Sequence, residues 1–321
     1  MKLLRTKRFL LPAMILFLLL GGGCQPASVA PAAGSTPAGP VKVLAAETFL
    51  ADIAQNVAGD RLKVDALLPI GADPHSYEPA PGDVTRAAQS NVLIVNGDGV
   101  EAYLEKLLQN AGGKHQVITA AAGLAGRAPR EGESVEKGAS APAAEAVDPH
   151  FWLDPTKVVK YTENIRDGLS QADPAGASVY AANAEGYIKK LGELDVAVMS
   201  QVRQVPPARR LLVTNHEALG YYADHYGFRV VGTVVPSVST EASPSAQELA
   251  QLVDRIRATQ APAIFLEAGT NPQLAQQVAR ETGTKIAHEL YLESLTGPAG
   301  PAPTYLEMIK YDTRVIVDAL K

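Results

Sequence analysis

The sequence predicts an α/β protein of two lobes, each a mostly parallel sheet with flanking helices, joined by one long helix. Three observations predict this fold class. Short runs rich in β-branched residues alternate with helical stretches, the alternation occurs twice, and a continuous apolar stripe lies between the two halves. Such alternation is typical of parallel sheets with crossover helices. A chain of 321 residues has room for about two domains of roughly 150 residues each.

The first lobe is expected over residues 41–172. Its strands are predicted at Val41–Ala46, Leu62–Pro69, Asn91–Gly97 and Gln116–Ala120. The helices between them are predicted at Phe49–Val57, Gly82–Ser90 and Val100–Asn110. Within this lobe, residues 126–147 are polar, low in complexity and without an aromatic residue, which predicts a mobile loop.

The linking helix is expected over residues 173–206. Asp173 is placed to cap it, and Pro174 suits the first helical position. Apolar residues recur at steps of three and four, at Tyr180, Ala184, Tyr187, Leu191, Leu194, Val198, Val202 and Val205. Pro206 and Pro207 end the helix. About 30 residues span roughly 45 Å, which is enough to join both lobes.

The second lobe is expected over residues 207–321 and repeats the rhythm of the first. Its strands are predicted at Arg210–Thr214, Arg229–Val235, Ala263–Glu267 and Lys285–His288. Its helices are predicted at Ala218–Tyr226, Pro244–Thr259, Pro272–Thr282 and Thr304–Leu320.

Composition excludes several classes of protein. With 46% hydrophobic and 20% charged residues, the chain is neither a multispan membrane protein nor a disordered one. Its single cysteine, Cys24, allows no intramolecular disulfide and no thiolate zinc cluster. The 29 basic and 34 acidic residues give a net charge of −5, so we expect no nucleic-acid partner.

Residues 1–23 are predicted to be a lipoprotein signal peptide. A basic start is followed by the apolar run Phe9–Leu20, which is too short to span a bilayer. Small residues directly before Cys24 resemble a bacterial lipoprotein signal, in which cleavage precedes the cysteine and its thiol takes a lipid. Leu20 stands four residues before Cys24 where three is usual, so ordinary secretion with nearby cleavage is the alternative.

The segment after the signal is predicted to be a flexible tether. Residues 24–40 are rich in Ala, Pro, Ser and Gly and can bury little surface. We therefore expect an extracytoplasmic protein, lipid-anchored to the membrane at Cys24, on a periplasmic face or an outer cell surface. Residues 1–23 carry four basic side chains and no acid, so their removal takes the net charge to −9.

Three of the six histidines stand in unusual contexts. His75 and His150 each end an Asp-Pro-His tripeptide, and His216 follows a predicted strand. Open parallel sheets place ligands beyond the carboxyl ends of their strands, and neutral imidazole is the commonest metal ligand. Three imidazoles suit Zn²⁺. Spacing alone leaves open that they are surface or turn histidines, because no local zinc motif such as HExxH accompanies them.

Several segments are similar to those of one family. They are LPIGADPHSYEP at 68–79, NVLIVNG at 91–97, DPHFWLDP at 148–155, TNHEALGY at 214–221, TEASPS at 240–245 and IFLE at 264–267. Together they resemble the metal-binding solute-binding proteins of ABC transporters, the zinc/manganese cluster. The resemblance covers about residues 41–321, in the right order. It implies two α/β lobes bridged by one long helix, with a metal ion buried in the cleft between them.

The resemblance also implies four metal ligands. His75, His150 and His216 match three of them, and Glu293 stands where the family most often has Asp. Glu289 is a competitor, four residues from the matching position. Four further acids could accept hydrogen bonds from the imidazole N–H groups, or could equally be turn caps and surface charges. They are Glu78, Asp148, Asp154 and Glu267.

The ligand set favours zinc. Three nitrogens and one carboxylate suit Zn²⁺ better than Mn²⁺, which prefers more oxygen ligands. Some zinc-type relatives carry a histidine-rich loop between the first two ligands, whereas residues 126–147 contain no histidine. Some three-histidine members of the family also handle manganese. The same role for Mn²⁺ or Fe²⁺ is therefore the alternative.

The expected function is binding, not catalysis. We expect a monomer that captures Zn²⁺ outside the cytoplasm and delivers it to an ABC permease. A zinc hydrolase with Glu217 or Glu293 as general base is the less favoured alternative, and it would need an open position on the metal. Neither a GxSxG motif nor a phosphate-binding loop accompanies the histidines.

Overall fold

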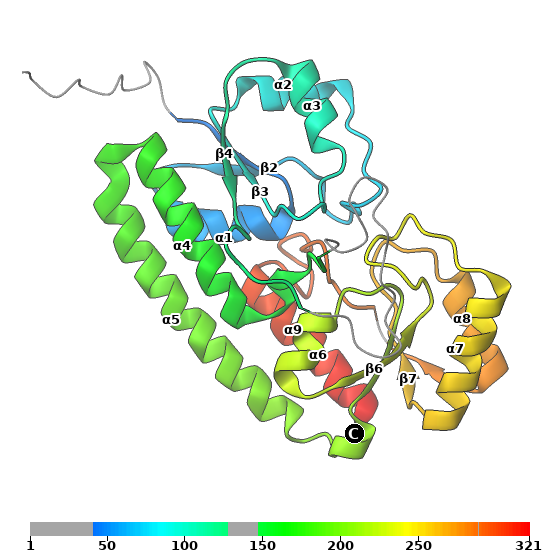
Figure 1. Ribbon diagram of the computed structural model, residues 1–321. Coiled ribbons are helices and arrows are strands. Elements are labelled where there is room, and N and C mark those ends of the chain that lie inside the picture. The colour runs from blue at the N-terminus through cyan, green and yellow to red at the C-terminus, as the bar shows by residue number, and fades with distance from the viewer. Residues whose placement is uncertain (1–40, 128–146, 288) are drawn as a thin grey trace, which may run out of the picture. The chain divides into compact units, whose positions relative to one another are not determined.

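The computed structural model describes residues 41–127, 147–287 and 289–321 (Figure 1). The predicted signal peptide, the tether with Cys24, His288 and most of the predicted mobile loop lie outside the described residues. Among the described residues, none of the helices combines the length and the apolarity needed to cross a membrane.

The first sheet has four parallel strands in the order β2-β1-β3-β4. They are β1 (Val43–Ala45), β2 (Val64–Ala66), β3 (Val92–Val95) and β4 (Gln116–Thr119). The connecting helices are α1 (Thr48–Ala58), α2 (Pro81–Gln89) and α3 (Leu104–Ala111). β1 and β3 are buried on both faces, which explains their continuous apolar sequence. α1 packs against the face with Val43 and Ile94, and α2 and α3 against the face with Leu44 and Leu93.

The second half repeats this strand order. β5 (Leu211–Thr214) pairs with β6 (Arg229–Thr233), and β7 (Ala263–Ile264) pairs with β8 (Lys285–Ile286), both in parallel. The N–H of Phe265 donates to the carbonyl of Val213 at 2.8 Å and joins the two pairs. The order is therefore β6-β5-β7-β8. The helices are α6 (Gly220–Tyr226), α7 (Ala246–Thr259), α8 (Gln273–Thr282) and α9 (Tyr305–Leu320). The α/β class with parallel sheets and flanking helices is confirmed.

The long helix is α5, which covers Ala177–Val202 and, at 26 residues, is about 39 Å long (Figure 1). Its predicted apolar stripe is buried from Tyr180 to Val202. The predicted cap is wrong. Residues 174–176 form a 3₁₀ turn, and the Asp173 carboxylate instead accepts hydrogen bonds from Arg61 Nη2 at 2.8 Å and Tyr180 Oη at 2.6 Å. The carboxylate that was expected to cap the helix is instead bound by Arg61, which lies 112 residues away in the chain.

A second long helix, α4 (Pro155–Ala172), precedes α5 and is absent from the sequence prediction. Asp154 caps it by accepting the N–H of Thr156 at 3.0 Å, and Pro155 occupies its first turn. The Asp154 carboxylate is therefore occupied by the N-terminus of α4. Of the two roles left open for Asp154, the cap is confirmed, and acceptance from a metal-binding imidazole is not what the structure shows.

Trp152 joins segments that are far apart in sequence. Its ring is fully buried and stacks on Phe49 with centroids 4.6 Å apart. Its indole N–H donates to the carbonyl of Leu292 at 2.7 Å, and Tyr305 Oη donates to the carbonyl of Trp152 at 2.7 Å. The residues beside His150 and Glu293 are thus fixed to a shared apolar core.

Candidate metal centre

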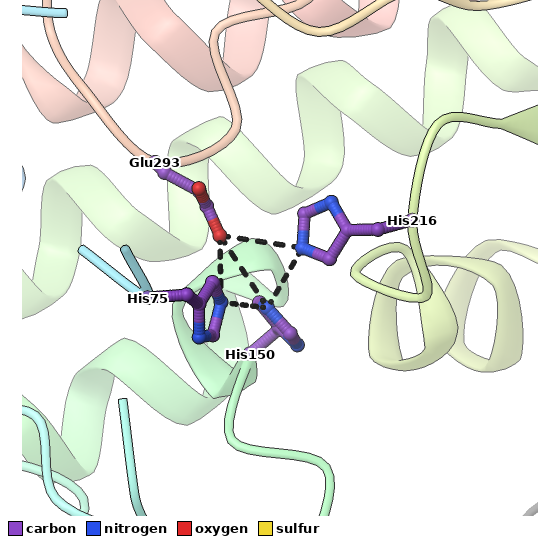
Figure 2. Close-up of side chains that lie close together, drawn as sticks. All are labelled: His75, His150, His216 and Glu293. Carbon is purple, nitrogen blue, oxygen red and sulfur yellow. Dashed lines mark hydrogen bonds and ion pairs between the residues drawn. The ribbon is translucent and has the colours of Figure 1, made fainter. Parts of the chain in front are cut away.

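Four side chains converge at one point between the halves (Figure 2). The Nε2 atoms of His75, His150 and His216 and one carboxylate oxygen of Glu293 all lie within 4.8 Å of one another. Glu293 Oε1 is 3.0 Å from His75 Nε2, 3.3 Å from His216 Nε2 and 3.6 Å from His150 Nε2. His150 and His216 are completely buried, and His75 is 8% exposed. The set that the resemblance implies is brought together by the fold.

Each ligand follows the carboxyl end of a strand or stands at the start of a helical turn. His75 lies in the loop after β2, and His216 lies two residues beyond β5. Glu293 follows the bridge between Glu267 and Leu290, and His150 directly precedes a 3₁₀ turn at 151–153. The competitor Glu289 is exposed. Because the strand ends of both halves face the same space, residues more than 200 apart in the chain can meet there.

The repeated Asp-Pro-His tripeptide has a structural basis. Asp73 Oδ1 accepts the backbone N–H of His75 at 2.9 Å, and Asp148 Oδ1 accepts that of His150 at 3.0 Å. An aspartate that accepts from the N–H two residues on forms a tight local turn. The same turn therefore presents two imidazoles to the centre from two different loops.

Two carboxylates orient the imidazoles. Asp148 Oδ1 lies 2.8 Å from His150 Nδ1, and Glu267 Oε2 lies 2.5 Å from His216 Nδ1. An ionised carboxylate can only accept, so each Nδ1 carries a proton, and each Nε2 can offer a lone pair to a metal once it has lost its own proton. Glu78, by contrast, is exposed, and within the described ranges no hydrogen bond joins it to these histidines. The suggested role for Glu78 is therefore wrong.

The resulting arrangement fits a cation. His150 Nε2 is 3.2 Å from His216 Nε2 and 3.3 Å from His75 Nε2. Ring nitrogens this close to each other need either a shared proton or a cation between them, because two facing lone pairs repel. Glu293 Oε1 is buried and has no hydrogen-bond partner, although three ring nitrogens surround it. A divalent cation would satisfy all four atoms at once.

The pKa values of these groups reflect the same crowding. Burial raises the pKa of Glu293, but the charge of His216 and contacts with the other two histidines outweigh it and hold this pKa well below its ordinary value. Burial lowers the pKa of His216, but the charges of Glu267 and Glu293 raise it well above the ordinary range. Burial lowers the pKa of His150, but the nearby carboxylates of Asp148 and Glu293 outweigh this effect and raise it.

Some groups near the centre have no obvious sequence signal. Arg127 stands at the start of the predicted loop, yet its guanidinium approaches Asp148 and Asp224. Tyr221 Oη donates to the carbonyl of Asp148 at 2.7 Å. Two of the remaining histidines are separate from the cluster. His115 lies beside the carbonyls of Ser90 and Gly112, and His225 pairs with Asp195.

The chain is similar to proteins named for metal binding. It is 32% identical over 280 residues to the manganese-binding lipoprotein MntA of Halalkalibacterium halodurans, covering 87% of this chain and 88% of that one. It is 33% identical over 268 residues to the iron-binding protein YfeA of Yersinia pestis, covering 84% and 82%.

The chain is also similar to solved structures of metal-binding proteins. A Mn-bound periplasmic metal binding protein from Candidatus Liberibacter asiaticus matches with a TM-score of 0.76 and 30% identity, covering 88% of this chain and 100% of that one. The periplasmic zinc binding protein TroA from Treponema pallidum matches with a TM-score of 0.77 and 25% identity, covering 88% and 99%.

Fold and comparisons together define a class, the metal-binding substrate-binding proteins of ABC transporters. This class consists of transport components and not of enzymes, so the hydrolase alternative has no support. A family model described as "Zinc-uptake complex component A periplasmic" matches residues 43–319, and the chain belongs to that family.

The contact between Glu267 and His216 allows a direct test. We expect Glu267→Gln to weaken Zn²⁺ binding by roughly 10–100-fold, because the amide no longer fixes the imidazole through a charged acceptor. Competition titration against a chelator measures the change. Glu78→Gln is the matched control, and it should bind as the wild type does. Equal losses in the two variants would contradict the role given to Glu267.

Proposed function

We propose that the protein captures Zn²⁺ in the cluster of His75, His150, His216 and Glu293 and delivers it to an ABC permease. The observation that carries this proposal is the convergence of four ligand atoms within 4.8 Å. Carboxylates contact Nδ1 of two of the imidazoles, so their Nε2 atoms face the centre. Four protein ligands complete a tetrahedron and leave no position for a reactive water, which suits binding and release better than catalysis.

Zinc is proposed over manganese because of the donor atoms. Three nitrogens and one oxygen suit a tetrahedral Zn²⁺ site, whereas Mn²⁺ favours oxygen ligands. The description of the family model also names zinc uptake. Mn²⁺ is the second candidate, with Fe²⁺ beside it, since relatives are named as manganese-binding and iron-binding proteins. A bidentate Glu293 carboxylate would supply the additional oxygen that Mn²⁺ prefers.

Metal content and competition decide between these ions. We expect protein purified without added metal to carry zinc by elemental analysis. In competition titrations we expect Zn²⁺ to displace Mn²⁺ at equal concentration, because Zn²⁺ stands above Mn²⁺ in the general order of affinities and the site is rich in nitrogen. Preferential retention of Mn²⁺ would reverse the choice of metal. Failure to bind either ion would contradict the proposal as a whole.

We also propose that the protein acts as a monomer outside the cytoplasm, held to the membrane by a lipid on Cys24. Several relatives are named as lipoproteins, which supports the anchor. Expressed in a bacterial host, Cys24→Ala should move the protein from the membrane fraction to the soluble fraction. Unchanged membrane association would contradict the anchor.

Zinc affinity is expected to depend on pH. A histidine must lose its proton before Nε2 can bind a metal, so protons and Zn²⁺ compete. Because the pKa of His216 lies above the ordinary 6.5, the competition begins above that pH. Affinity should therefore fall as the pH is lowered, by about tenfold per pH unit where one proton is displaced. Chelator competition at about pH 6, 7 and 8 measures this slope. A constant affinity would contradict histidine ligation.

A further inference from the structure

Arg127 lies directly behind one of the carboxylates that orient the histidines. Its side chain is 9% exposed, and its Nη1 is 3.7 Å from Asp148 Oδ2. The other oxygen of that carboxylate, Oδ1, is the one that faces His150 Nδ1 at 2.8 Å. On its opposite side, Arg127 pairs with Asp224 through Nε at 3.0 Å and Nη2 at 3.4 Å. Arg127 thus joins the Asp148–His150 unit to helix α6.

We propose that Arg127 is a positioning residue for metal binding, which fixes Asp148 so that His150 and His216 face each other at the spacing a metal needs. The inference rests on the proposed function, because it concerns how strongly the same centre holds its ion. Arg127 itself touches no ligand atom in the described structure and acts through Asp148.

The connection to His216 runs through α6. His216 lies four residues before this helix, and Asp224 lies within it. Tyr221, also on α6, accepts the backbone N–H of Arg127 at 3.2 Å and donates to the carbonyl of Asp148 at 2.7 Å. The Tyr221 ring stacks on Phe151 with centroids 4.6 Å apart. One short helix therefore supports both imidazoles, although they belong to different halves of the molecule.

The pair of Arg127 and Asp148 packs directly against the start of α6. A Cβ added at Gly220, the first residue of α6, would lie 2.6 Å from Arg127 Nη1 and 2.7 Å from Asp148 Oδ2. Any side chain at this position must displace the ion pair. Gly220→Ala is therefore a perturbation of the Arg127–Asp148 geometry that removes no polar group.

Two effects of Arg127 on the centre have opposite signs. Its positive charge disfavours a nearby cation, so removing the charge alone would tighten metal binding. Its removal would also leave the buried Asp148 carboxylate without its counter-charge and without the side chain that holds it against the His150 N–H. Loss of an orienting partner typically costs roughly 10–100-fold in metal affinity, so we expect the second effect to dominate.

Zinc competition titrations on a set of variants test the inference. We expect Arg127→Met to weaken Zn²⁺ binding by roughly 10–100-fold and Gly220→Ala to weaken it in the same direction. Arg127→Lys, which keeps the charge but not the planar fork, should recover part of the loss. Arg61→Met is the matched control, because Arg61 forms a similar two-contact pair with Asp173 away from the centre. This control should bind as the wild type does.

A positioning role differs from a general loss of stability in two readouts. In an Asp148→Asn background, Arg127→Met should have little further effect, because its target is already altered. The visible absorption of Co²⁺ bound in place of Zn²⁺ should change in Arg127→Met and stay the same in Arg61→Met. Where Arg127→Met does not fold, Gly220→Ala and Arg127→Lys give the same comparison.

The outcomes separate this inference from the proposed function. If the wild-type protein binds no Zn²⁺, the proposed function fails. If the wild type binds Zn²⁺ and Arg127→Met binds equally well, only the role of Arg127 fails. Equal losses from Arg127→Met in the wild-type and Asp148→Asn backgrounds would also overturn it, since Arg127 would then not act through Asp148.

Discussion

Replacing His216 with alanine is expected to weaken Zn²⁺ binding by roughly 10²–10³-fold. Structural zinc sites bind with roughly 10–16 kcal/mol, so one of four ligands accounts for about 2.5–4 kcal/mol. We expect the loss to fall within this range, because the Nε2 atom that faces Glu293 at 3.3 Å disappears with the imidazole. Competition titration at fixed pH measures the change.

The matched control is His225→Ala. His225 is also an imidazole paired with an acid, since its Nε2 lies 2.7 Å from Asp195 Oδ1, but it stands outside the cluster. Its replacement should leave Zn²⁺ affinity unchanged. If both variants lost affinity equally, the effect would come from a general disturbance of the fold. If neither did, His216 would not be a ligand.

Trp152→Ala is expected to lower the free energy of unfolding by about 3–5 kcal/mol, the usual cost of truncating a large buried aromatic side chain. The change removes the stack on Phe49 and empties a fully buried volume. It also leaves the carbonyl of Leu292 without the indole N–H that it accepts. Because Leu292 adjoins Glu293, we expect metal affinity to fall together with stability.

Chemical denaturation followed by circular dichroism measures this loss, since Trp152 is the single tryptophan and its removal abolishes intrinsic indole fluorescence. Trp152→Phe retains an aromatic ring and loses the N–H donor. It should cost less, about 1–3 kcal/mol for the unsatisfied carbonyl and the smaller ring. A loss below about 1 kcal/mol for Trp152→Ala would contradict the anchoring role of this residue.

Most elements of the fold are predictable because their local signals agree with their tertiary roles. The buried strands β1 and β3 are continuous apolar runs, and the stripe along α5 recurs at helical spacing. Helix α4 was not predicted, although its start carries a recognisable signal. Asp-Pro opens α4 at residue 154 and recurs at residue 173, but only the first pair caps a helix. The Asp173 side chain binds Arg61 instead, and nothing in the sequence around Asp173 indicates this tertiary contact.

The candidate centre is predictable to a different extent for each member. His75 and His150 are marked by a repeated tripeptide that proves to be a repeated turn. Glu293 depends on resemblance alone, because a single acid in a loop carries no pattern. The choice among the outer acids depends on which side chain faces an imidazole after folding. Glu267 contacts His216 from 51 residues away, whereas Glu78 stands three residues from His75 and forms no hydrogen bond or ion pair with the described histidines.

The deep burial of the cluster selects among ions by the cost of removing their hydration shell. An ion held there by four side chains must shed its hydration shell, and only one of those side chains supplies oxygen. Mg²⁺ dehydrates reluctantly and needs six oxygens in octahedral geometry, and Ca²⁺ takes six to eight. Coordination by one oxygen and three nitrogens does not compensate either ion for the hydration free energy that it loses on leaving water. We therefore expect a large excess of either alkaline-earth ion to leave zinc in place.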